Sequence, residues 1–268
     1  MKGESKKVCI VTGGSSGIGK CTVSSLLGKG CTVYEFSRRD PGSGNIGQHI
    51  YCDVTDEETV GNAVSSVLQK EGRIDILVNC AGSGISGAIE FTDLDDAKRQ
   101  FDVNFFGMVN VCKAVLPVMR RQSSGRIVNI SSVAAPVSIP FQAFYSASKA
   151  AINSYTLSLA NEVRNYGITV TAVQPGDIST GFTSARKKSE KGDKEYGGRI
   201  KRSVAKMEKD EINGMRPEDA GKYIAKIALK KRIKPLYAIG FSYKAICVLC
   251  KILPAGATNK LVYLLYSK

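Results

Sequence analysis

A glycine-rich turn between a strand-like run and a helix-like run constrains the fold of this chain more than any other feature. Residues 7–12 are short and rich in β-forming side chains, and residues 20–29 have the apolar spacing of a helix. Between them lies the sequence Thr12-Gly13-Gly14-Ser15-Ser16-Gly17-Ile18-Gly19. A strand, a tight turn and a helix begin a βαβ unit, so the sequence predicts an α/β fold.

The chemistry of this turn suits a phosphate-bearing ligand. Glycines let the backbone take positive φ and let a pyrophosphate approach closely, and the next helix offers free N–H groups and the positive end of its dipole. The spacing is Gly-x-x-x-Gly-x-Gly, which differs from the Gly-x-Gly-x-x-Gly dinucleotide pattern. Taken alone, the turn fits a structural role as well as a dinucleotide site.

A second pattern lies in the middle of the chain. Tyr145 and Lys149 are four residues apart on one face of a predicted helix, and Ser132 follows a strand-like run at residues 126–130. A phenol is a weak acid-base at neutral pH unless a nearby cation favours phenolate, and Lys149 could be that cation. By itself the pair is more often a solvated helix face. With Ser132 it suits proton transfer to or from an alcohol or ketone oxygen.

The turn and the trio together resemble the short-chain dehydrogenase/reductase family, over about residues 5–240. The motifs occur in the family's order, with Asn104 in Val103-Asn104-Phe105 at the fourth catalytic position. The resemblance implies a Rossmann-type, doubly wound parallel sheet with helices on both faces and a C-terminal helical extension. It also implies an oxidoreductase that interconverts a secondary alcohol and a ketone with a nicotinamide cofactor.

The resemblance assigns roles to the four catalytic residues. Tyr145 would be the general acid in reduction and the general base in oxidation, and Ser132 would hydrogen-bond the same substrate oxygen. Lys149 would lower the pKa of Tyr145 and hold the nicotinamide ribose. Asn104 would support a water chain that carries protons to bulk solvent.

The resemblance also implies the residues that bind the cofactor. They lie in the glycine-rich turn, after the second and third strands, in the Asn-x-Ala-Gly segment, in the catalytic pair and after Pro175. In that order they are Gly13, Ser15, Ser16, Gly17, Ile18, Gly19, Ser37, Arg38, Arg39, Asp53, Val54, Asn79, Ala81, Gly82, Tyr145, Lys149, Pro175, Gly176, Ile178 and Thr180.

The end of the second predicted strand favours NADP(H) over NAD. An acidic side chain there would bind both ribose hydroxyls of NAD and repel an added phosphate, but Ser37 is neutral. Arg38 and Arg39 follow directly and offer planar forks suited to a 2′-phosphate, although they could simply cap the strand. Glu35 lies on the same strand face as Ser37, and we expect it to be too deep to reach the ribose.

Composition limits the alternatives. At 268 residues and 43% hydrophobic, the chain can bury one substantial core, so we expect a single catalytic domain over residues 1–268. A Ser-His-Asp hydrolase or a multi-His metal site is hard to build with one histidine, His49, which we expect just before a strand. We therefore expect no metal. Six of the eight cysteines are scattered singly, and Cys247 and Cys250 form a pair in an apolar setting that favours packing, so we expect free thiols. The polar start indicates no secretion signal and a cytoplasmic protein.

The net charge of +14 lies almost entirely in the last third of the chain. From residue 186 onward, 21 basic residues face 8 acidic ones, and no acidic residue follows Asp219. By resemblance, residues 177–215 form a substrate lid that is poorly ordered without ligand, followed by a helix that starts near Pro217. The lysines of the lid could attract an acidic substrate, or they could belong to a solvated loop.

The C-terminal extension, residues 235–268, combines two short apolar runs with lysines and tyrosines. Neither run, 245–250 or 261–266, reaches the roughly 20 residues of a spanning helix. Two amphipathic helices there could lie on an anionic membrane surface, cover the substrate cleft or pack on a second subunit. Nucleic acid is not an expected partner, because basic and aromatic residues are not interleaved.

The loop between Ser132 and Tyr145 is strongly apolar, which favours a hydrophobic substrate. The leading hypothesis is an NADP(H)-dependent hydroxysteroid or related lipid-alcohol dehydrogenase. The alternatives are a 3-oxoacyl thioester reductase and a sensor or scaffold that binds NADP(H) without turnover. By resemblance, helices at residues 101–121 and 144–166 would assemble a homodimer or homotetramer.

Overall fold

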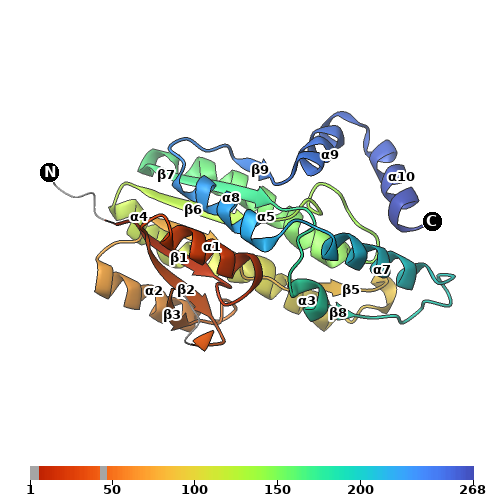
Figure 1. Ribbon diagram of the computed structural model, residues 1–268, viewed down its shortest axis with the longest axis horizontal. Helices are drawn as coiled ribbons and strands as arrows, with labels where there is room; N and C mark the ends of the chain where they lie inside the picture. The colour runs from red at the N-terminus through yellow and green to blue at the C-terminus, as the bar shows by residue number, and fades with distance from the viewer. Residues whose placement is uncertain (1–5, 43–46) are drawn as a thin grey trace.

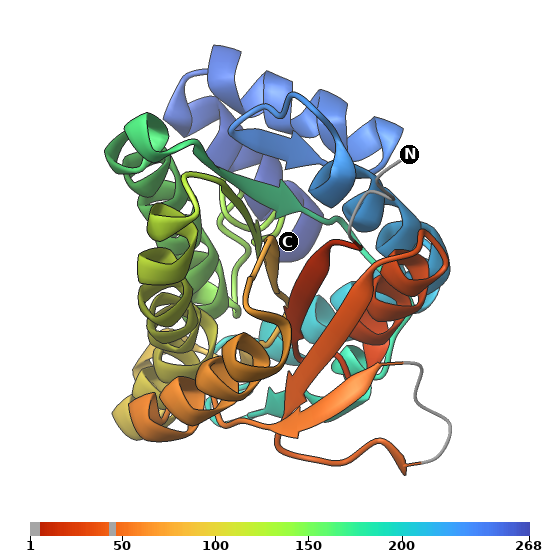
Figure 2. The same ribbon diagram turned by 90° about the vertical axis from the view of Figure 1, so that its left-hand side faces the viewer.

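Short runs rich in Val and Ile form the seven strands of one parallel sheet. The computed structural model describes residues 6–42 and 47–268. The strand order is β3-β2-β1-β4-β6-β7-β9 (Figure 2). The strands are β1 (Val8–Thr12), β2 (Thr32–Ser37), β3 (Gln48–Tyr51), β4 (Ile76–Asn79), β6 (Gly125–Ile130), β7 (Ile168–Gln174) and β9 (Leu236–Ala238). This order confirms the predicted doubly wound sheet.

The order reverses at β1, which pairs with β2 on one side and β4 on the other. Thr12, the last residue of β1, lies level with Phe36 and Asn79. Its hydroxyl accepts hydrogen bonds from the N–H groups of Cys80 and Ala81, at 3.1 Å each, and so fixes the chain that leaves β4. Open α/β sheets bind ligands at such a reversal, beyond the carboxyl ends of the strands.

Helices cover both faces of the sheet (Figures 1 and 2). All five residues of β1 are buried, as expected for a central parallel strand, and their side chains alternate between two cores. Cys9 and Val11 face the core under one helix pair, whereas Val8 and Ile10 face the core under the other three helices. These are α1 (Gly17–Leu27) with α8 (Pro217–Leu229), and α2 (Glu57–Glu71) with α4 (Gly107–Arg121) and α5 (Ala143–Glu162).

The helix that we expected at residues 101–121 is interrupted. A short helix, α3 (Leu94–Phe101), passes through a π-helical turn, η3 (Asp102–Phe106), before α4 begins. The stretch Leu94–Arg121 is long and apolar enough to cross a membrane by length and composition alone. Core helices of globular proteins can be as long and as apolar. Val111, Val115 and Met119 of α4 are fully buried against the sheet, so α4 is a core helix here. The second expected helix, residues 144–166, ends at Glu162 and continues as a 3-10 turn, η4 (Arg164–Tyr166).

The proposed lid, residues 177–215, is folded against the rest of the molecule. It contains α6 (Phe182–Ala185), β8 (Lys187–Lys188) and α7 (Arg199–Ile212). The strand β8 pairs with β5 (Ile85–Ser86), which is followed by a 3-10 turn, η2 (Ile89–Phe91). Apolar residues of α7, including Ile200 and Met207, are buried with Phe141. The mobility of this segment stays a prediction.

The C-terminal extension begins later than we expected. Residues 236–238 form the edge strand β9, so the extension proper is the helix pair α9 (Phe241–Ile252) and α10 (Ala255–Tyr266). The two helices stand beside the sheet layers (Figure 1). Most of their side chains are not buried; Cys247 of α9 and Val262 of α10 are.

Candidate active site

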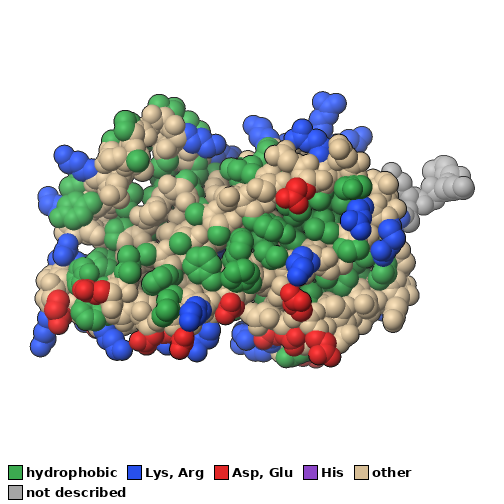
Figure 3. All heavy atoms as spheres, turned by 180° about the vertical axis from the view of Figure 1, so that it is seen from behind, with side chains coloured by type: hydrophobic (Ala, Val, Ile, Leu, Met, Phe, Trp, Pro, Cys, Tyr) green, Lys and Arg blue, Asp and Glu red, His purple; other side chains and the backbone are tan. Residues whose placement is uncertain are grey.

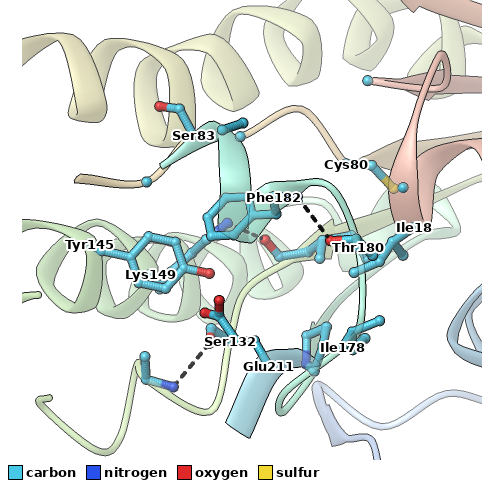
Figure 4. A pocket seen from close by; sticks show the side chains of 18 of the residues that line it. Ile18, Cys80, Ser83, Ser132, Tyr145, Lys149, Ile178, Thr180, Phe182 and Glu211 are labelled. Carbon is cyan, nitrogen blue, oxygen red and sulfur yellow. Dashed lines mark hydrogen bonds between the residues drawn. The ribbon is translucent and has the colours of Figure 1, made fainter. Parts of the chain in front are cut away.

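A cavity of about 660 Å³ lies beyond the carboxyl ends of β1, β4, β6 and β7. It begins at the glycine-rich turn, passes the segment after β4 and the catalytic trio, and ends against α7 and α10. Figure 4 shows the part around the trio. Tyr266 of α10 and Met207 of α7 line its far end. The cavity therefore brings together most of the residues that the sequence singled out.

The catalytic trio is assembled by β6 and α5. Ser132 follows the end of β6, and its hydroxyl accepts a hydrogen bond from the N–H of Ala134 at 3.1 Å. Tyr145 lies in the first turn of α5, and Lys149 lies one turn later. The Lys149 ammonium is 5.7 Å from the centre of the Tyr145 ring and donates to the carbonyl of Ile130 at 2.9 Å. The three side chains thus line the same cavity.

Burial shifts both titratable members of the trio. Burial raises the pKa of Tyr145 to about 12, against a smaller opposing effect of its hydrogen bond with Ser132. Burial also lowers the pKa of Lys149 to about 8. Burial is the largest cause of the raised Tyr145 pKa here, and the Lys149 ammonium is bonded to a carbonyl, so the lowering of the Tyr145 pKa by Lys149 stays a prediction. A protonated phenol suits Tyr145 to act as an acid.

Asn104 lies in the π-helical turn, behind the cavity wall. Its side chain accepts from the N–H of Ser83 at 2.7 Å and donates to the Ser83 carbonyl at 3.0 Å and the Ser148 hydroxyl at 3.1 Å. Asn104 therefore ties the segment after β4, which lines the cavity, to the catalytic helix. Single-turn π-bulges are frequent at functional sites.

The glycine-rich turn forms an open cradle. Gly13 and Gly17 have positive φ, at 64° and 51°. Helix α1 begins at Gly17, and its N-cap residue, Ser16, makes no side-chain capping bond. A Cβ atom on Gly19 would lie 2.1 Å from the Gly13 carbonyl oxygen, so the turn closes only with glycine there. The first N–H groups of α1 thus border the cavity, in the arrangement that binds phosphate.

A second cavity of about 190 Å³ lies beside the turn, lined by Ser15, Ser37, Arg38, Arg39, Asp53 and Val54 among others. Arg38 is 3.6 Å from Asp53, and its side chain is 68% exposed. Burial alone would raise the pKa of Asp53, but hydrogen bonds from Thr55 and the Arg38 guanidinium lower it below its ordinary value. The exposed guanidinium beside a neutral Ser37 fits the 2′-phosphate of NADP(H).

Glu35 lies below this cavity and does not line it. Its side chain is fully buried, and a Cβ atom on Gly14 would lie 2.7 Å from the Cβ of Glu35. It accepts from Ser37 at 3.1 Å and lies 2.5 Å from Nδ1 of His49. His49 was expected before a strand and instead lies inside β3, where it is the partner of this buried carboxylate.

Nearly all predicted site residues line one of the two cavities. The exceptions are Asn104 and Asn79, which is buried at the end of β4 and donates to Asn129 at 2.9 Å. Other cavity residues were missed, including Ser83, Gln142, Asp177, Phe182, Glu211 and Tyr266. The ring centre of Phe182 is 5.8 Å from that of Tyr145. Phe182 lies two residues after Thr180, a predicted site residue, so its nearness in the sequence was a signal for its place in the cavity.

Comparison with known proteins shows what the chain is similar to. A family model described as short chain dehydrogenase matches residues 7–191. The chain is 42% identical to the 3-ketodihydrosphingosine reductase of Bacteroides thetaiotaomicron, over 88% of this chain and 91% of that protein. A short-chain dehydrogenase from Streptomyces avermitilis superposes with a TM-score of 0.80, at 31% identity over 90% of each chain. ElxO with NADP bound superposes with a TM-score of 0.74, at 28% identity over 90% of this chain and 99% of ElxO.

Proposed function

The chain belongs to the short-chain dehydrogenase family, and on that premise we propose that it is an NADPH-dependent reductase of long-chain lipid ketones of the 3-ketodihydrosphingosine type. The observation that carries the proposal is the cavity, which leads from the Ser132 and Tyr145 hydroxyls to an end lined by Met207 of α7 and Tyr266 of α10. The 42% identity to a 3-ketodihydrosphingosine reductase supports an acyl-chain ketone. These apolar side chains also suit the hydroxysteroid that the sequence favoured. We prefer the long-chain lipid because of the similarity to the 3-ketodihydrosphingosine reductase.

The proposed reduction follows from the trio. The substrate oxygen lies between the two hydroxyls, so that Ser132 donates a hydrogen bond and Tyr145 gives up its proton to the oxygen. The glycine-rich turn and Arg38 would hold NADPH, which would supply the hydride for the carbonyl carbon. Lys149 then returns a proton toward Tyr145, and Asn104 keeps α5 and the Ser83 segment in place. An intact proton-transfer set disfavours the alternative of a sensor without turnover.

The pH profile of reduction follows from the two shifted groups. Tyr145, with a pKa of about 12, stays protonated at neutral pH, whereas Lys149 loses its proton as the pH rises through about 8. We expect kcat/KM for the ketone to be flat from about pH 6 to about pH 8 and to fall up to tenfold per unit above that range. A pH-rate series measures this, and an unchanged rate up to about pH 10 would contradict the role of Lys149.

The cofactor preference depends on Arg38. Arg38→Ala removes the guanidinium beside Ser37, and loss of a charge-assisted hydrogen bond to phosphate should raise the KM for NADPH about 10- to 100-fold. The KM for NADH should stay unchanged, which makes NADH the internal control. Equal KM values for both cofactors in the unaltered enzyme would overturn the assignment.

We further propose that α9 and α10 bind an anionic lipid surface, from which the substrate enters. Phe241 is 91% exposed and Ile252 is 74% exposed, and they lie among lysines in a stretch without acidic residues. Hydrophobic side chains cover this protrusion at the upper left of Figure 3. Tyr266 of α10 reaches the cavity, so the same helix borders the surface and the substrate site. The proposal is therefore a cytoplasmic enzyme that binds a membrane face.

Vesicle flotation tests the membrane proposal. The unaltered protein should float with vesicles that contain anionic lipid, and Phe241→Ser with Ile252→Ser should weaken binding at least tenfold, because each buried side chain contributes about 1.5–3 kcal/mol. Leu94→Ser is the matched control, since Leu94 is 63% exposed on α3. Equal flotation of all three proteins, or none, would contradict the proposal.

A separate apolar group fits self-association. Phe106 is 52% exposed at the end of η3 and Leu157 is 41% exposed on α5. Hydrophobic side chains gather across the middle of the face seen in Figure 3, which α4 and α5 cover. A homodimer or homotetramer through these helices stays a prediction.

A further inference from the structure

The charged side chains that line the cavity change from basic to acidic along its length. At the adenosine end its charged lining residues are Arg38 and Arg39, and at the catalytic centre Lys149. Beyond the trio, within the described part of the chain, the charged residues of the lining are Asp177 and Glu211, and no lysine or arginine joins them. The lid is strongly basic on its outside, yet it presents carboxylates to the substrate. This arrangement disfavours an acidic substrate attracted by the lid lysines.

Glu211 is held rigidly at the edge of the catalytic centre. It lies near the end of α7, where its carboxylate accepts from the Thr183 hydroxyl at 2.7 Å and forms an ion pair with Arg186. Arg186 is itself buried, with its guanidinium 5.6 Å from the centre of the Phe182 ring, and it does not line the cavity. A carboxylate has about four acceptor positions, so two bonds leave capacity for a ligand.

Glu211 points at the reacting groups. Figure 4 shows its carboxylate directed toward the Tyr145 hydroxyl and Ser132. Its negative charge contributes to the raised pKa of Tyr145, after burial. An anion directed toward these two hydroxyls would face a group attached to the carbon next to a ketone bound there.

Asp177, the other carboxylate, is already engaged. It accepts from the Tyr243 hydroxyl of α9 at 2.5 Å, and burial raises its pKa. The Tyr243 ring also packs against Gly176, where a Cβ atom would lie 2.2 Å from it. Asp177 therefore anchors the C-terminal extension to the site, whereas Glu211 is the carboxylate that Figure 4 shows directed toward the Tyr145 hydroxyl and Ser132.

We propose that Glu211 binds a protonated primary amine on the carbon next to the ketone, and that it thereby selects 2-amino ketones over ketones without a charge. The inference rests on the proposed function and specifies its head-group recognition. A charge-assisted hydrogen bond from an ammonium to a carboxylate is strong, and an uncharged ketone leaves the remaining acceptor positions of Glu211 unfilled. The amine also fixes which face of the ketone lies against Tyr145.

The test compares two substrates of equal chain length, 3-ketodihydrosphingosine and the same ketone without the amine. Glu211→Gln keeps the shape and the bond from Thr183 but removes the charge. We expect kcat/KM for the amino ketone to fall about 10- to 100-fold, with the amine-free ketone unchanged or faster. Glu208→Gln is the matched control, because Glu208 lies on the same helix, pairs with Lys188 and does not line the cavity.

Two further measurements keep a folding defect apart from a binding defect. Glu211→Gln leaves the buried Arg186 without its ion pair, which could disturb the folding of the lid. The double variant Glu211→Gln with Arg186→Gln removes this unpaired charge. It should therefore keep the lid folded and still discriminate poorly between the two ketones. In the unaltered enzyme, kcat/KM for the amino ketone relative to the amine-free ketone should fall as the amine loses its proton. If the unaltered enzyme reduces neither ketone, the proposed function fails. If it reduces both equally, before and after Glu211→Gln, only the role of Glu211 fails.

Discussion

Tyr145→Phe should lower kcat for ketone reduction by about 10²- to 10⁴-fold, which is the contribution of a positioned general acid. The change removes one hydroxyl from a side chain that is buried beside Ser132 and leaves the ring against Phe182. No other described group of the cavity is placed beside Ser132 with an acidic proton suited to the substrate oxygen. Binding of NADPH should persist, because Lys149 and the glycine-rich turn are untouched.

Stopped-flow or steady-state NADPH oxidation measures the rate, and fluorescence titration measures NADPH binding. Tyr155→Phe is the matched control, since Tyr155 lies on the same helix, packs against Phe105 and does not line the cavity. It should retain nearly full activity. A Tyr145→Phe enzyme with more than about a tenth of the normal rate would show that another group donates the proton.

Gly19→Ala should abolish cofactor binding and destabilise the fold. The added Cβ would lie 2.1 Å from the Gly13 carbonyl oxygen, which no side chain tolerates, so the turn must open and move the first N–H groups of α1. Overpacking of this kind costs about 1–3 kcal/mol of the free energy of unfolding. The expected result is a dissociation constant for NADPH raised at least 100-fold and a lower Tm, because the phosphate cradle is lost.

Gly61→Ala separates the local effect from a general effect of glycine replacement. Gly61 lies in α2, and a Cβ there would meet nothing within 4 Å. Alanine is the better helix former by about 1 kcal/mol, so this variant should unfold at an equal or higher temperature and bind NADPH normally. Normal NADPH binding by Gly19→Ala would contradict the phosphate role of the turn.

The parts of the site that the sequence predicts are those built from neighbouring residues. The glycine-rich turn, the Tyr145–Lys149 pair and the Arg38 fork are each formed within one turn or one strand end, so their spacing carries their geometry. The order of the sheet follows from the same family pattern. The helix start near Pro217 is also local, because proline favours the first turn of a helix.

The parts that the sequence did not predict depend on contacts between distant segments. Glu211 reaches the site because α7 packs with Phe141, and Tyr266 reaches it because α10 returns beside α7. The π-helical turn at Asn104 lies between two helices, and its residues do not differ in type from those of the helices, so the sequence does not reveal it. The raised pKa of Tyr145 results from burial by the whole surroundings, which the nearby lysine alone does not reveal.

The measurement that tests the central claim most directly is NADPH oxidation by the unaltered enzyme with 3-ketodihydrosphingosine, a keto steroid and a medium-chain 3-oxoacyl thioester, each also tested with NADH. We predict turnover of 3-ketodihydrosphingosine with NADPH at a kcat/KM at least tenfold above that of the steroid, the thioester and the NADH reaction. Turnover of the thioester or the steroid alone would contradict the proposed substrate, and equal rates with NADH would contradict the proposed cofactor.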